Sequence, residues 1–175
     1  YHFDTEKLAK VFYDVCLRNG VEFVDDKYIR ADKSDDGNIA SIKCENGIHE
    51  ADLFVDCTGF HSELLGKVMG VSYKSYANTL INHRAIAAKI PYTDKNKQLT
   101  SYTNNVTMNN GWCYEIPLWD GMSVGYVHSL KFATPDSIEK EFTDRYGVEP
   151  SKGVEFRTGR YEKAWVKNVA SVGLS

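Results

Sequence analysis

A short apolar strand that runs into a small-residue turn is the first place where this sequence could bind a ligand. Residues 51–59 read ADLFVDCTG, so Thr58 and Gly59 directly follow an apolar run. Glycine has no Cβ, and its backbone can therefore approach a bound group closely. Ligands of open α/β sheets bind at the carboxyl ends of strands. Thr58 and Gly59 could therefore lie beside a dinucleotide, or they could form an ordinary strand-to-helix turn, and these residues alone leave both interpretations open.

A second candidate is the aromatic pattern in residues 111–118, which read GWCYEIPL. In a strand, Trp112, Tyr114 and Ile116 share one face because successive side chains point to opposite sides. Two aromatic rings on one face can wall a pocket for a planar ligand. Burial in an ordinary core is the alternative. Pro117 is expected to end the strand or to lie at a sheet edge.

Two further segments could contact a ligand. Arg157 and Arg160 could hold a phosphate or carboxylate through forked hydrogen bonds, or they could form surface ion pairs. Residues 172–175 read VGLS, again a strand that enters a small-residue turn. This run repeats the pattern seen at Gly59.

The sequence contains no recognised metal-binding or phosphate-binding motif. The five histidines are scattered without the spacing of metal ligands, and the four cysteines, at positions 16, 44, 57 and 113, form no CxxC pair. GxGxxG, Walker A and GxSxG sequences are also missing. We therefore expect no metal site, and reduced, mostly buried thiols typical of a cytoplasmic protein.

The composition is that of an ordinary globular domain. The 175 residues are 42% hydrophobic and 26% charged, with a formal net charge of −3. This mix excludes disorder as the main state, and the basic footprint of a nucleic-acid-binding protein is missing. No apolar run reaches the roughly 20 residues of a membrane helix. The expected protein is about one cytoplasmic domain with neither nucleic acid nor membrane as a partner.

The elements that must position these residues form a mixed α/β pattern. Asp4 caps a helix whose apolar residues recur at helical spacing as far as Cys16, and Asn19 and Gly20 end it. Short strands are predicted at 21–24, 28–31, 39–44 and 48–56, followed by a helix at 62–69. Beyond residue 80 the predicted strands are 85–90, 99–108, 112–118, 123–130, 154–158 and 164–172. A helix is predicted to start at Thr134-Pro135 and to end at Gly147.

Several segments together resemble one family, the flavin-dependent tryptophan halogenases. The matching stretches run in order along the chain: His2-Phe3-Asp4, Gly20-Val21, residues 51–60, Tyr102-Thr103, Met108, residues 111–117, Gly125-Tyr126-Val127, Ser129, Phe156-Arg157, Gly159-Arg160, Trp165, Asn168 and residues 172–175. The resemblance implies an α/β (mixed α+β) chain that forms part of an FAD-binding fold like that of flavoprotein monooxygenases, with an antiparallel sheet region. Residues 1–75 would belong to the FAD-binding module, 76–168 to the substrate side, and 169–175 to a strand returning to the FAD-binding module.

The resemblance also implies a reaction. In this family FAD, reduced by a separate flavin reductase, reacts with oxygen to give a flavin hydroperoxide, and a halide ion attacks it to give hypohalous acid. The acid moves through a tunnel to a lysine beside tryptophan or another indole substrate. The flavin carries the hard chemical step, and the protein supplies position and water exclusion.

Site residues follow from the same resemblance, position by position. It implies FAD contacts at Tyr28 (through its backbone), Thr58, Gly59 and Leu174. Trp112 matches the first Trp of the family's WxWxIP signature, beside the tunnel. The second Trp of that signature is Tyr114 here, which keeps an aromatic face but changes the shape of the wall.

The resemblance finally implies what the chain lacks. The family's glycine-rich phosphate loop and catalytic lysine would precede Tyr1, and the residues that serve substrate and halide would follow Ser175. No lysine here matches the catalytic one, so we expect no halogenase activity from the chain by itself. A related flavin monooxygenase and a non-catalytic interaction module stay open as alternatives. Unpaired sheet edges would favour association of copies, unless the chain is part of something longer.

Overall fold

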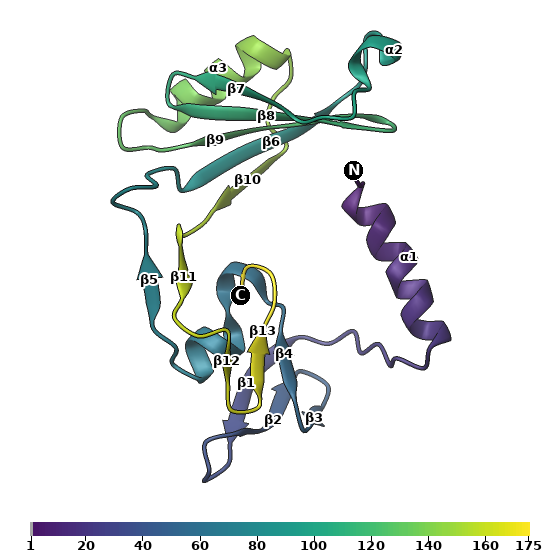
Figure 1. Cartoon of the computed structure of the whole chain (residues 1–175), viewed down its shortest axis with the longest axis vertical. Helices are drawn as coiled ribbons and strands as arrows, with labels where there is room; N and C mark the ends of the chain where they lie inside the picture. Colours follow the sequence, from purple (N-terminus) through teal and green to yellow (C-terminus); the bar gives the residue numbers. More distant parts are fainter. Residues whose placement is uncertain (1) are drawn as a thin grey trace. The chain divides into compact units, whose positions relative to one another are not determined.

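The computed structural model describes residues 2–175, which form two compact units (Figure 1). One unit comprises the residues up to Glu22 together with Tyr76–Thr158, and the other comprises Phe23–Ser75 and Gly159–Ser175. The first helix thus groups with the segment that begins at Tyr76. The assignment of residues 1–75 and 169–175 to an FAD-binding module, and of 76–168 to a substrate side, stays a prediction.

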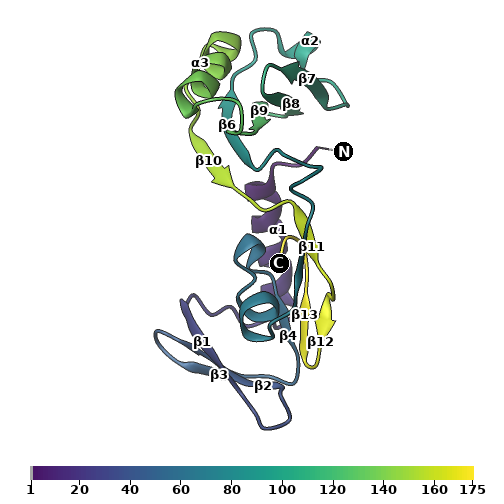
Figure 2. The ribbon, with the colours of Figure 1, turned by 90° about the vertical axis from the view of Figure 1, so that its left-hand side faces the viewer.

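The first unit is built on a five-stranded antiparallel sheet in the order β10-β6-β9-β8-β7. Its strands are β6 (Arg84–Ile90), β7 (Asn104–Met108), β8 (Gly111–Leu118), β9 (Gly121–His128) and β10 (Lys152–Glu155). Helix α3 (Pro135–Tyr146) covers one face, as Figures 1 and 2 show. The core between them consists of Ala88, Cys113, Val124, Tyr126, Ile138 and Phe142.

Helix α3 begins and ends where the sequence predicts. The Thr134 hydroxyl accepts from the N–H of Ser137, whose own hydroxyl accepts from the N–H of Thr134. This reciprocal cap satisfies two of the N–H groups that a helix start leaves unpaired. Gly147 ends the helix with a φ of +68°, the left-handed region that glycine adopts without steric cost.

Helix α1 (Thr5–Arg18) also confirms its prediction, but its apolar stripe is uncovered. The Asp4 carboxylate accepts hydrogen bonds from the N–H groups of Glu6 and Lys7 at the helix start. No residue of α1 is buried, and Val11 and Phe12 are 56% and 59% exposed. None of the helices in residues 2–175 has the length and apolar character needed to span a membrane. A four-residue helix, α2 (Lys95–Gln98), is not predicted by the sequence pattern.

The second unit contains three small sheets. Strands β1 (Tyr28–Lys33), β2 (Ile39–Cys44) and β3 (Ile48–Glu50) form an antiparallel meander, and β5 (Tyr73–Ser75) pairs with β11 (Gly159–Tyr161). The third sheet has the order β12-β13-β4, with β12 (Trp165–Val166), β13 (Val169–Ser171) and β4 (Phe54–Asp56). A 3₁₀ turn, η1 (Gly59–His61), and a π-helical segment, η2 (Glu63–Val68), follow β4.

The core of this second unit joins the meander to the parallel strands. It consists of Ile39, Phe54, Leu64, Leu65 and Val169. Asn168 reinforces it, because its side-chain amide exchanges two hydrogen bonds of 2.9 Å with the backbone of Ile39. The mixed α/β class predicted from the sequence is therefore confirmed in the arrangement of elements.

Some predicted elements are wrong or incomplete. Residues 21–24 form no strand, and Val21 and Val24 are 48% and 50% exposed because no neighbouring strand pairs with them. The predicted strand 48–56 is interrupted at 51–53, since β3 and β4 join different sheets. Cys44 and Cys113 are buried as expected, but Cys57 is exposed. In β4, Phe54 and Asp56 are buried while Val55 is exposed, and Cys57 continues this alternation on the exposed side.

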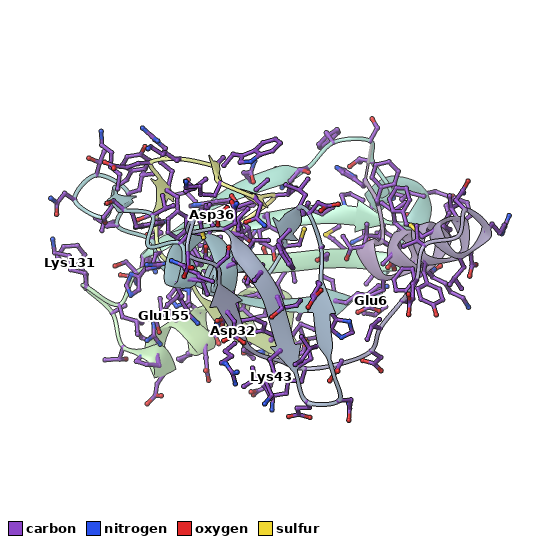
Figure 3. All side chains as sticks on the ribbon, turned by 90° about the horizontal axis from the view of Figure 1, so that it is seen from below. Glu6, Asp32, Asp36, Lys43, Lys131 and Glu155 are labelled. Carbon is purple, nitrogen blue, oxygen red and sulfur yellow. The ribbon has the colours of Figure 1, made fainter. Side chains whose placement is uncertain are left out.

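Ion pairs link neighbouring strands at the surface. Arg84 donates to Glu155 at 2.7 Å, and these residues lie opposite each other in the β6–β10 register. Glu155 is labelled in Figure 3 together with Asp32, which accepts from Arg30 on the same strand. Exposed pairs of this kind contribute at most about 1 kcal/mol. The two apolar cores therefore provide most of the stability.

Candidate functional site

The parallel pair β4–β13 brings two of the predicted ligand turns to one edge. Phe54 lies opposite Val169 and Asp56 opposite Ser171, so both strands end at the same side of the sheet. The N–H of Gly59 donates a hydrogen bond to Oγ of Ser175 at 2.8 Å. The turn after β4 and the turn after β13 thus form one continuous edge, which we call the β4–β13 edge.

The backbone at this edge is free of covering atoms at its two glycines. Gly59 and Gly173 have φ values of +63° and +80°, and a Cβ added at either would find no atom within 4 Å. Thr58 is exposed, and Leu174 is 64% exposed. The carboxyl edge of parallel strands is where dinucleotides bind in α/β sheets, and glycine lets the backbone approach them. The residues present therefore fit an FAD molecule laid against this edge.

A buried carboxylate holds the edge in shape. Asp56 is fully buried, and its Oδ1 accepts from the N–H of Thr58 at 3.0 Å and from the Thr58 hydroxyl at 2.6 Å. Its Oδ2 accepts from the N–H groups of Leu64 and Leu65 at 2.9 and 2.8 Å. One side chain therefore fixes the turn after β4 and the start of η2 together.

These hydrogen bonds determine the ionisation of Asp56. Burial raises the pKa of its carboxyl group, but the bonds from Thr58, Leu65 and Leu64 outweigh burial and place the pKa below its ordinary value of 3.8. Hydrogen bonds to the charged form favour that form. Asp56 is therefore a carboxylate at neutral pH, and it positions the turn rather than exchanging protons.

Two hydroxyl side chains complete the support. Oγ1 of Thr58 accepts from the N–H of Glu63 at 2.8 Å, and Oγ of Ser62 accepts from the N–H of Gly66 at 2.9 Å. Ser62 has a φ of +41°, which is uncommon for a residue with a Cβ. Such strain persists where the surrounding structure holds the backbone in place, and Ser62 also donates its N–H to the carbonyl of Gly59 at 3.0 Å.

Sequence reasoning missed both Asp56 and Ser62. A signal for Asp56 was present, because an aspartate at the end of an apolar strand must find hydrogen-bond partners if it is buried. Thr58, two residues later, provides a hydroxyl and an N–H at the right place. For Ser62 the sequence gives no comparable signal, since its left-handed backbone depends on the π-helical turn that follows.

Tyr28, the fourth predicted FAD contact, packs inside the same unit. It is half-buried on β1 against the core that contains Leu64 and Leu65. Burial, followed by the negative charge of Glu63, raises the pKa of its phenol. A contact between Tyr28 and FAD stays a prediction.

The predicted aromatic face belongs to the other unit. Trp112 and Tyr114 have ring centroids 6.4 Å apart at 62°, and they lie on the sheet face opposite α3 because the intervening Cys113 belongs to the α3 core. The ring of Tyr114 covers Gly125, where a Cβ would come within 2.2 Å of Cζ. Trp112 stays 41% exposed. The shared face is thus confirmed, whereas the role of these rings as a tunnel wall stays a prediction.

Comparison with known protein families gives a match over the whole chain. A family model described as "Tryptophan halogenase" matches residues 1–175. Tryptophan 7-halogenase KtzQ of Kutzneria sp. is 34% identical over 181 residues, which cover 100% of this chain and 34% of KtzQ. Tryptophan 7-halogenase RebH of Lentzea aerocolonigenes is 33% identical with the same coverage. The chain therefore spans about a third of the length of the curated relatives it matches.

Solved structures give the same result. MibH, described as a lathipeptide tryptophan 5-halogenase, has a TM-score of 0.92 at 34% identity, and the match covers 99% of this chain and 33% of MibH. SttH, a tryptophan 6-halogenase from Streptomyces toxytricini, has a TM-score of 0.93 at 31% identity, with 99% and 35% covered. Tar14, a flavin-dependent chlorinase for tryptophan C-6, has a TM-score of 0.93 at 32% identity, with 99% and 35% covered.

Proposed function

Because the chain belongs to the tryptophan halogenase family, we propose that it forms the FAD-contacting and tunnel-lining part of a flavin-dependent halogenase. The family and the FAD-binding-fold class expected from the sequence are thereby confirmed. The structural similarity does not favour a non-halogenating monooxygenase or an inert interaction module.

The observation that carries this proposal is the hydrogen bond between Gly59 and Ser175 at the β4–β13 edge. When bound there, FAD supplies the oxidising chemistry that activates the halide ion. The backbone of Gly59 and of Leu174 would hold FAD there, and Asp56 and Thr58 hold the turn after β4 in its open form. In the other unit, Trp112 and Tyr114 would form part of a tunnel wall in the complete enzyme.

The substrate class follows from the relatives. KtzQ and RebH are named as tryptophan 7-halogenases and SttH as a tryptophan 6-halogenase. We propose tryptophan or another indole for the present enzyme, with chloride or bromide as the halide and a separate flavin reductase as the source of reduced FAD. Tyr114, in place of a second Trp in the family signature, keeps an aromatic face in the tunnel wall but changes its shape.

Location and assembly are further parts of the proposal. Buried free thiols at Cys44 and Cys113 support a reducing, cytoplasmic compartment. The exposed apolar side chains of α1 support its packing against further protein, either additional segments of a longer enzyme or a second copy.

The test is halogenation by the protein expressed from the complete coding sequence that contains this segment. Purified protein is mixed with tryptophan, FAD, a flavin reductase with its nicotinamide cofactor, and either chloride or bromide, and the products are identified by mass spectrometry. We expect monohalogenated tryptophan from this protein with at least one of the two halides, and none from the 175-residue chain alone. Full-length protein that binds FAD but yields only unmodified or hydroxylated substrate with tryptophan and simple indoles would overturn the proposal.

A further inference from the structure

Three side chains with metal-binding atoms meet at one end of the β1–β2–β3 meander. The carboxylate of Asp26, the thiol of Cys44 and the imidazole of His49 each place a ligand atom within 4.8 Å of the other two. Asp26 precedes β1, Cys44 ends β2, and His49 lies in β3. Their spacing in the sequence matches no metal motif, so only the fold reveals the cluster.

The register of the meander explains why Cys44 and His49 are close. His49 lies opposite Ile42, and Cys44 follows Ile42 by two residues on β2. Residues two apart on a strand share a face, and so do directly opposed residues on neighbouring strands. The tight turn after Cys44, closed by its N–H donating to the carbonyl of Gly47 at 2.8 Å, brings β3 back alongside β2 in the same sheet.

Asp26 is fixed at the same turn by its own hydrogen bonds. Its carboxylate accepts from the N–H of Lys27 at 2.8 Å, and from the backbone and side-chain N–H groups of Asn46 at 3.1 Å each. A carboxylate oxygen has two lone-pair sites, so these bonds leave acceptor capacity toward Cys44 and His49. Asp26 is therefore held in place as a third donor.

An independent observation points to a missing ligand. Nε2 of His49 is shielded from solvent and has no hydrogen-bond partner in the structure. An unsatisfied buried polar group is costly, and each such group in a native structure calls for an explanation such as a bound ion. The imidazole that carries this nitrogen is the one that lies with Cys44 and Asp26 in the cluster.

We propose that Asp26, Cys44 and His49 bind a zinc ion, with water as the fourth ligand. Thiolate, imidazole and carboxylate are the ligands that Zn²⁺ takes in proteins, whereas Ca²⁺ and Mg²⁺ prefer oxygen alone. In a tetrahedral zinc site neighbouring ligand atoms lie about 3.5 Å apart. The three ligand atoms now lie within 4.8 Å of one another, so zinc binding requires them to draw closer, with the half-buried His49 side chain moving toward the other two. Binding displaces the proton of the Cys44 thiol into solvent.

Three protein ligands and a water are also the ligand set of catalytic zinc sites, but we assign this ion a structural role. A nucleophilic role for Cys44 would require contact with a substrate, yet its side chain is only 7% exposed. A zinc ion instead ties the segment before β1 to the hairpin β2–β3. Because an unfolded chain does not present the three donors together, zinc stabilises the folded form by mass action.

The first experiment is titration of the full chain with Co²⁺, a spectroscopic substitute for Zn²⁺. We expect one equivalent to produce a thiolate-to-cobalt charge-transfer band and the visible bands of tetrahedral cobalt. Both signals should disappear on competition with Zn²⁺ and in C44S and H49Q. The matched control is C16S, which removes a thiol on helix α1 and should retain the signals. Retention of the band in C44S would place the metal elsewhere and overturn the proposal.

A second experiment uses the unaltered chain, so it does not depend on how the variants fold. Iodoacetamide labelling is followed by peptide mass spectrometry with and without Zn²⁺. We expect zinc to slow labelling of Cys44 at least tenfold while the exposed Cys57 reacts at an unchanged rate. Equal labelling of Cys44 under both conditions, with zinc in excess, would contradict the site.

Discussion

The N–H of Gly59 donates a hydrogen bond to the side-chain oxygen of Ser175 across 116 residues of sequence, at 2.8 Å. Gly59 follows β4 and Ser175 follows β13, so this bond closes the edge at which two parallel strands end. The FAD contacts proposed for Gly59 and Leu174 depend on this edge and on its support by Asp56.

Removal of the Asp56 charge should destabilise the second unit. In D56N the side chain keeps its shape, but an amide NH₂ group replaces one of the two carboxylate oxygens. That group cannot accept hydrogen bonds, and it would face backbone N–H donors that lose their acceptor. Because hydrogen bonds to a charged group contribute about 1.5–3 kcal/mol each, we expect a loss of about 3 kcal/mol in the free energy of unfolding. Urea denaturation followed by circular dichroism measures it. D52N, at an exposed position nearby, should change stability by less than about 0.5 kcal/mol; equal effects of both variants would refute the anchoring role.

The same carboxylate should make stability depend on pH in acid. The pKa of Asp56 is lower in the folded chain than in the unfolded chain. As the pH falls below the pKa of an unfolded aspartate, about 3.9, the unfolded chain therefore takes up a proton before the folded chain does. The contribution of Asp56 is therefore complete above that value and is lost as the pH falls through the folded pKa. Urea titrations between neutral pH and acid should show this loss in the native chain and a smaller one in D56N. Parallel pH profiles for the two proteins would contradict it.

On the aromatic face, G125A should displace the ring of Tyr114. An added Cβ would come within 2.2 Å of that ring, and overpacking of this kind costs about 1–3 kcal/mol. We expect a lower unfolding midpoint and an altered near-ultraviolet circular dichroism spectrum, since Trp112 and Tyr114 lie in contact. G153A is the matched control in the same sheet, because a Cβ there meets no atom within 4 Å. An unchanged aromatic spectrum in G125A would show that the ring does not occupy this position.

Local signals explain which elements could be predicted. Helix α1 has a capping Asp4 and a terminating Gly20, and α3 has Thr134 and Gly147, so their bounds can be read from the sequence. The strands β5 and β11 have three residues each, too few for an alternating pattern to stand out. At residues 21–24 the sequence pattern predicts a strand, but none forms, because these apolar residues have no partner strand.

Only part of the candidate site could be predicted, because its two turns have local sequence patterns but their meeting does not. The turns at Gly59 and at residues 172–175 carry their own sequence patterns, but their union depends on the parallel pairing of two three-residue strands. Pairing between segments so far apart has no local signal. Asp26, Cys44 and His49 likewise come together through strand register and a hairpin turn. The family resemblance supplied what the physical patterns lacked, namely the cofactor.

The most direct test of the central claim is the FAD dissociation constant of the full-length protein with and without a side chain at Gly59. G59V places bulk in the open β4–β13 edge, and G70V imposes a similar backbone strain elsewhere in the unit, since the two glycines have φ values of +63° and +68° and open surroundings. Fluorescence titration should give micromolar or tighter binding for the native protein and for G70V. We predict that G59V binds FAD at least tenfold more weakly, a loss of about 1.4 kcal/mol. Equal affinity of a folded G59V and G70V would show that FAD does not lie at this edge.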